Sequence, residues 1–213
     1  MKYIISLLLM LATNASWAQG TEYPKAKVSF DDFKGLVAEV EPHRASRLID
    51  LETFLEMSQE PGVIILDARS AFRFERIHLK GAAHLAFTDF TQDNLAKVIP
   101  SFDTKLLIYC NNNFVGNQTD FASKVVSPRF LTDAAASKQL AAQEKPLMMA
   151  LNVPTYINLY GCGYRNVYEL DELVSVSDPR IVFEGTTLES KLAVPLEVGG
   201  KVIHRLSNPL QAP

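Results

Sequence analysis

Short apolar segments that alternate with helix-like segments are the feature that most limits how this chain can fold. Residues 63–66, 82–85 and 105–109 are short and mostly apolar, and polar capping residues precede the intervening segments 71–77 and 92–98. A strand–helix–strand–helix–strand order is typical of a parallel sheet with helices outside it. The sequence therefore predicts an α/β fold, with a mostly parallel central sheet and helices on both faces.

Further elements are expected on either side of this core. Ser29 and Asp50 suit the N-caps of two helices, over about residues 30–40 and 51–59. We expect Pro42 to end the first of these helices. The remaining predicted elements are an edge strand over 47–50, a helix capped by Asn152 with Pro154 in its first turn, and a strand over 166–170.

The first 18 residues have the order of a secretory signal peptide. Lys2 precedes an apolar run over 4–12, and Ser16 and Ala18 are small residues at the positions that a signal peptidase reads. The apolar run is far shorter than the roughly 20 residues that a membrane span needs. We therefore expect cleavage after Ala18 and a periplasmic or secreted protein that no longer contacts the membrane.

The rest of the chain divides into one domain and three additions. Polar, small residues interrupt the helix–strand rhythm near the middle of the chain, and Gly199 and Gly200 separate two apolar segments near its end, as in a β-hairpin. The predicted parts are an N-terminal extension (19–46), the domain (47–180) with an insertion at about 117–150, and a C-terminal extension (181–213).

Composition excludes several classes of function. The net charge is −3 and no basic run is present, so nucleic acid is not an expected partner. The four histidines have no metal-ligand spacing, and no metal is expected. Two cysteines do not make a disulfide scaffold. In a parallel sheet Cys110 and Cys162 would lie at opposite edges, beyond the roughly 7 Å Cα separation that a disulfide allows.

Cys110 stands at the end of the predicted strand 105–109 and opens a polar loop. Asp67 and Arg69 follow the strand 63–66 in the same way. Because ligands bind at the carboxyl ends of parallel strands, this edge is the expected active cleft. Asp67 and Arg69 are expected to order the rim of this cleft. In a purely structural role, they would cap the helix 71–77 and pair with acids such as Glu75.

Four motifs resemble, in the same order, those of the rhodanese-like superfamily. They are a strand ending in Asp67-Ala-Arg69, the stretch Ile77-His-Leu-Lys-Gly81-Ala82, the strand that leads to Cys110, and Gly163-Tyr-Arg-Asn-Val-Tyr-Glu-Leu170. The resemblance implies a three-layer fold and sulfur transfer without a cofactor. Cys110 would be the catalytic nucleophile, taking sulfane sulfur from a small sulfur-containing anion and passing it to a thiol acceptor.

The loop after Cys110 is expected to hold the anion through backbone N–H groups and asparagine amides. It consists of Asn111, Asn112, Asn113, Phe114, Val115 and Gly116. It carries no charge, whereas the family's sulfurtransferase loops usually carry arginine or lysine. A second hypothesis is therefore a non-catalytic rhodanese-like binding module that uses the insertion 117–150 as its partner surface. A third is a thiol redox protein that uses both cysteines.

Overall fold

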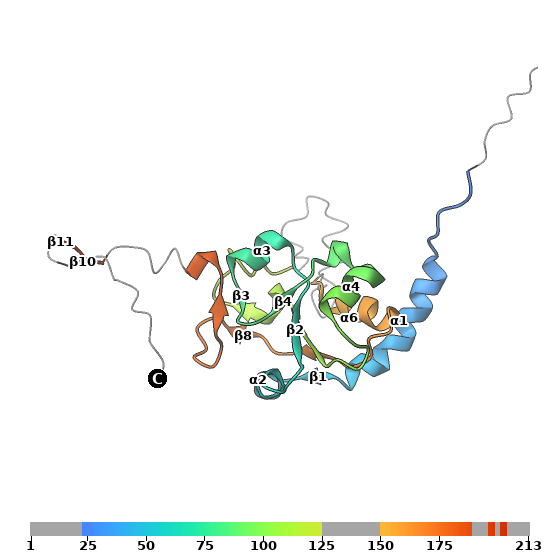
Figure 1. The fold of residues 1–213 in the computed structure, drawn as a ribbon, viewed down its shortest axis with the longest axis horizontal. Coiled ribbons are helices and arrows are strands. Elements are labelled where there is room, and N and C mark those ends of the chain that lie inside the picture. The colour runs from blue at the N-terminus through green and yellow to red at the C-terminus, as the bar shows by residue number, and fades with distance from the viewer. Residues whose placement is uncertain (1–22, 125–149, 189–195, 199–200, 204–213) are drawn as a thin grey trace, which may run out of the picture.

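A five-stranded parallel sheet forms the centre of the protein (Figure 1). The computed structural model describes residues 23–124, 150–188, 196–198 and 201–203. The predicted signal peptide and most of the predicted insertion lie outside these residues. The strands in sheet order are β1 (Leu48–Ile49), β7 (Val167–Leu170), β5 (Leu106–Tyr109), β2 (Ile64–Asp67) and β4 (Ala83–His84).

Side chains of the central strands alternate between two apolar layers. Leu106 and Ile108 pack with α1 (Phe30–Ala45), α4 (Gln92–Val98) and α6 (Asn152–Gly161) on one face. Leu107 and Tyr109 pack on the other face with α2 (Leu51–Ser58). Burial on both faces explains why these strands are continuously apolar rather than alternating. The predicted three-layer α/β fold is confirmed.

Smaller elements surround the sheet. The described residues also include a helix and two 3-10 turns: α3 (Ala71–Arg76), η1 (Phe87–Asp89) and η2 (Asn111–Asn113). Three further strand pairs are β3 (His78–Leu79) with β9 (Phe183–Glu184), β6 (Phe114–Val115) with β8 (Val174–Ser175), and β10 (Leu196–Val198) with β11 (Lys201–Ile203). The last pair is antiparallel, as the predicted hairpin requires, although residues 192–195 and 204–206 lie outside the described part.

The predicted caps of α1 and α2 are present. Ser29 Oγ accepts a hydrogen bond from Asp32 N at 3.1 Å, and Asp50 Oδ1 accepts one from Thr53 N at 2.8 Å. In contrast, the prediction that Pro42 ends the first helix is wrong, because α1 continues to Ala45. The turn beyond the proline is held by tertiary contacts of His43 and Arg44, which compensate for the backbone hydrogen bond that proline cannot donate.

Side chains from the last turn of α1 contact α6 and β7. His43 Nδ1 and Tyr156 Oη form a hydrogen bond of 2.9 Å. Arg44 donates two hydrogen bonds of 2.6 Å to the Glu169 carboxylate. Glu169 is only 3% exposed, so the pair attaches α1 to the interior of the domain.

Within the described residues, no helix is long and apolar enough to cross a membrane.

The start of α6 differs from the prediction. Asn152 is the first helical residue rather than the cap, and the preceding residue, Leu151, makes no capping hydrogen bond. The Asn152 side chain instead donates to Asn113 Oδ1 at 2.9 Å. Tertiary contact thus replaces the local cap, and α6 is joined to the loop that follows Cys110.

Candidate functional site

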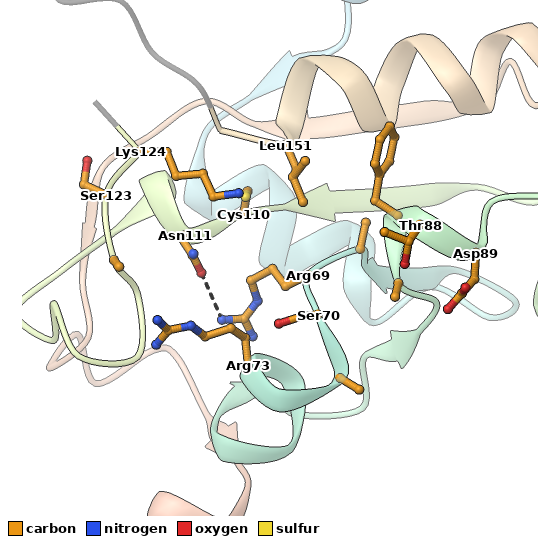
Figure 2. A pocket seen from close by; sticks show the side chains of 15 residues that line it. Arg69, Ser70, Arg73, Thr88, Asp89, Cys110, Asn111, Ser123, Lys124 and Leu151 are labelled. Atoms are coloured by element: carbon orange, nitrogen blue, oxygen red, sulfur yellow. Dashed lines mark hydrogen bonds between the residues drawn. The ribbon is translucent and has the colours of Figure 1, made fainter. Parts of the chain in front are cut away.

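The carboxyl ends of β2, β4 and β5 open onto one cavity of about 590 Å³ (Figure 2). Residues 68–70 follow β2, residues 86–89 come after β4, and Cys110 and Asn111 follow β5. Ala71 and Arg73 of α3, Ala122–Lys124 and Leu151 complete the wall. Arg69 and Cys110 were predicted to lie at one edge of the sheet, and both line this cavity.

Cys110 lies on the wall of this cavity but is only 1% exposed. Asn113 N donates to the carbonyl oxygen of Cys110 at 3.1 Å, which closes the turn that begins at the thiol. Burial raises the pKa of the Cys110 thiol, and the backbone N–H groups of Leu151 and Asn111 counteract this only in part. The free thiol is therefore largely protonated near neutral pH.

Asp67 and Arg69 form a buried ion pair with each other. The Arg69 Nη2–Asp67 Oδ2 distance is 2.6 Å, and both side chains are at most 2% exposed. Tyr109 Oη donates to the same carboxylate at 2.5 Å. The predicted capping of the following helix and pairing with Glu75 is wrong, because this pair draws both side chains inward.

The same arginine is connected to the Cys110 loop. Arg69 Nη1 donates to Asn111 Oδ1 at 3.3 Å, shown dashed in Figure 2, while its Nη2 donates to the carbonyl oxygen of Ile77 at 2.6 Å. The guanidinium therefore bridges the loop after β5 and the end of α3. Its positive charge lies on the cavity wall but is already neutralised by Asp67.

The six predicted anion-binding residues do not surround the thiol as one cradle. Asn111 alone of the six lines the cavity with Cys110. Asn113 turns inward: its Oδ1 accepts from Cys110 N at 2.8 Å and its Nδ2 donates to Leu170 O at 2.7 Å. With Asn112 it lines a separate cavity, next to Glu169. Asn113 therefore stabilises the loop rather than exposing a free amide at the thiol.

The end of the loop also leads away from Cys110. Phe114 is 2% exposed and packs against Tyr109, Phe121 and Phe183. Val115 pairs with Ser175 in the β6–β8 ladder. Gly116 has φ +98°, and a Cβ there would approach Val176. The apolar attraction of Phe114 to the core explains why the chain leaves the site instead of curling around it.

Two cations at the cavity were not identified from the sequence. Arg73 comes from α3, four residues after Arg69, and Lys124 comes from the start of the predicted insertion. Arg73 Nη1 donates to the carbonyl oxygen of Thr119. The place of Arg73 in the helix that starts just after β2 is a signal that could have indicated it, since the first turns of that helix lie near the strand end. No sequence pattern indicates Lys124.

The two cysteines of the chain do not pair with each other. Cys110 and Cys162 are both free thiols. Cys162 follows α6, before β7 begins, whereas Cys110 follows the end of the parallel strand β5, so the two lie at opposite ends of the sheet. Among the described residues, no group of three or more histidine, cysteine or acidic side chains is placed to hold a metal ion.

Comparison with known proteins identifies the family. The sequence model described as the rhodanese-like domain matches residues 50–172, which is more than half of the chain. The chain belongs to the rhodanese-like domain family. The match includes the Asp67–Arg69 pair, Cys110, and the whole of α6 and β7.

Two solved structures are similar to this rhodanese-like chain at low identity. The BH2092 protein from Bacillus halodurans is 15% identical, with 64% of this chain and 74% of that chain covered and a TM-score of 0.33. The Alr3790 protein from Anabaena sp. is 14% identical, with 66% and 93% covered and a TM-score of 0.34. No curated protein matches the chain.

Proposed function

We propose that this rhodanese-like protein is a sulfurtransferase or persulfide carrier in which Cys110 is the nucleophile. The observation that carries the proposal is the place of the thiol: it follows the central strand β5 and lines a cavity together with Arg73 and Lys124. Ligands of α/β proteins bind at the carboxyl ends of the parallel strands, and the Cys110 thiol lies there. The cations favour an anionic sulfur donor.

The reaction has two steps. The Cys110 thiolate attacks the outer sulfur of a donor such as thiosulfate, the donor's S–S bond breaks, and sulfite leaves with the bonding electrons. Cys110 then carries a persulfide. In the second step the thiolate of an acceptor attacks the outer sulfur of that persulfide, and the Cys110 thiolate is released. Neither step requires a cofactor.

Burial of the thiol supports the alternative function, a non-catalytic binding module. Cys110 is 1% exposed and burial raises its pKa, both of which lower the reactivity of a free thiol. In this alternative Cys110 is a core residue, and the segment 117–150 contacts a protein partner. Most of that segment lies outside the residues that the structure describes.

Intact-mass analysis after incubation with thiosulfate distinguishes the two functions. We expect wild-type protein and the Cys162→Ser variant to gain one sulfur atom each, and Cys110→Ser to gain none. Cys162→Ser is the matched control because it removes the other thiol of the chain. If all three proteins keep their original mass with thiosulfate and with organic persulfide donors, the sulfurtransferase proposal is wrong and the binding module is favoured.

A further inference from the structure

The cavity contains positive charge although the Cys110 loop contains none. The six residues after Cys110 are uncharged. Of the cations that line the cavity, Arg69 is neutralised by Asp67, and Arg73 and Lys124 belong to other segments. In Figure 2 the Lys124 side chain points toward Cys110 and Leu151, and Arg73 lies on the same side of the cavity, away from Thr88 and Asp89. The positive charge is thus brought to one side of the site.

The backbone at Lys124 is attached to the Cys110 loop. Lys124 N donates to Asn112 Oδ1 at 2.8 Å. Asn112 is the second residue after the thiol, so this hydrogen bond joins the segment that carries the lysine to the turn that carries the nucleophile. The backbone of Lys124 is therefore held against the turn that follows Cys110.

The residues that precede Lys124 are anchored as well. Phe121 is fully buried, with the Arg69 guanidinium 4.8 Å from its ring centroid. Asp120 accepts a hydrogen bond of 2.6 Å from Arg76 Nε. Arg73 donates to the Thr119 carbonyl. These contacts connect residues 119–121 to α3 and to the core. They therefore fix the position of the backbone that leads to Lys124.

We propose that Lys124 is the residue that selects anionic substrates at Cys110, and that it supplies from outside the loop the positive charge that the loop lacks. The inference rests on the proposed function, because it names the charge of the sulfur compound that binds there. Arg73 contributes to the same positive region but also holds Thr119, so Lys124 is the better position to test. Lys124 acts on binding and does not take part in the bond changes.

Two alkylating reagents of similar size but different charge provide the test. Iodoacetate is an anion and iodoacetamide is neutral, and each alkylates a thiolate, with formation of a C–S bond and loss of iodide. The rate of each reaction at Cys110 is measured in the Cys162→Ser background, for Lys124, Lys124→Gln and Lys124→Arg. Lys34→Gln is the matched control, because Lys34 is exposed on α1 and does not line the cavity.

We expect Lys124→Gln to lower the ratio of the iodoacetate rate to the iodoacetamide rate about two- to fivefold, the effect of one exposed charge. Lys124→Arg should preserve the ratio, Lys34→Gln should leave it unchanged, and high salt should reduce the difference. With thiosulfate, Lys124→Gln should raise the concentration that gives half-maximal sulfur loading, with little change in the maximal rate.

The inference is overturned if Lys124→Gln changes both alkylation rates equally or changes neither. It is also overturned if neither reagent alkylates Cys110 in the folded protein even at alkaline pH, where the thiolate forms, since the cavity is then closed to molecules of this size. Failure of the proposed function would give a different pair of results. In that case no donor transfers sulfur to the wild-type protein, whereas the ratio of alkylation rates still responds to Lys124→Gln.

Discussion

At the scale of single residues, Arg69 connects the stability of the fold to the geometry of the site. One guanidinium contacts the buried carboxylate of Asp67, the carbonyl of Ile77 and the amide oxygen of Asn111. A buried ion pair is not by itself strongly stabilising, but removal of one partner leaves the other charged and desolvated. The pair therefore fixes the residue beside the thiol, and its loss should affect stability and reactivity together.

Asp67→Ala is expected to lower the free energy of unfolding by about 3–5 kcal/mol, because it leaves Arg69 buried without a counter-charge. The measurement is urea denaturation followed by circular dichroism. Glu60→Ala is the control, since Glu60 and Lys105 form a partly exposed ion pair and such pairs contribute about 0–1 kcal/mol. Equal losses in the two variants would contradict the structural role assigned to Asp67.

The pH dependence of Cys110 reactivity follows from its burial. The pKa of the thiol is raised, so less thiolate is present at neutral pH than in an ordinary cysteine, and the fraction increases as the pH rises. The alkylation rate at Cys110 should increase about tenfold per pH unit below that pKa and reach its plateau at a higher pH than that of a small free thiol. A plateau already reached near pH 7 would contradict the raised pKa.

At the scale of elements, contacts distant in sequence decide the details that local patterns leave open. The caps of α1 and α2 and the identity of the central strands were predictable, because Ser29 and Asp50 act on neighbouring N–H groups and apolar runs determine strand burial. The end of α1 was not predictable, because Arg44 binds Glu169, which is 125 positions away. Asn152 likewise contacts Asn113 instead of capping α6.

Arg44→Ala tests how α1 is held. The substitution leaves the buried Glu169 carboxylate without its two hydrogen bonds and should lower the free energy of unfolding by about 2 kcal/mol. Hydrogen exchange should speed up mainly in the last turn of α1. Lys34→Ala, on an exposed turn of the same helix, serves as the reference. If the two variants unfold at the same urea concentration, the attachment of α1 does not depend on Arg44.

At the scale of the whole molecule, the candidate site is assembled from segments that are far apart in the sequence. The position of Cys110 and its proximity to Arg69 were predictable, because both follow parallel strands. The surroundings of the thiol were not, because Lys124 and Leu151 flank the segment where the regular alternation stops. The loop that was predicted to hold the anion instead places Phe114 in the core. The site therefore depends on the entire domain.

Transfer of sulfur through Cys110 tests the central claim most directly. The Cys162→Ser protein is loaded with thiosulfate, freed of excess donor, and mixed with a small thiol, and both the intact protein and the thiol are analysed by mass spectrometry. We predict that one sulfur atom leaves each loaded protein and is recovered as one acceptor persulfide. A protein that gains no sulfur, or that retains it with every thiol tested, would contradict a sulfurtransferase or carrier built around Cys110.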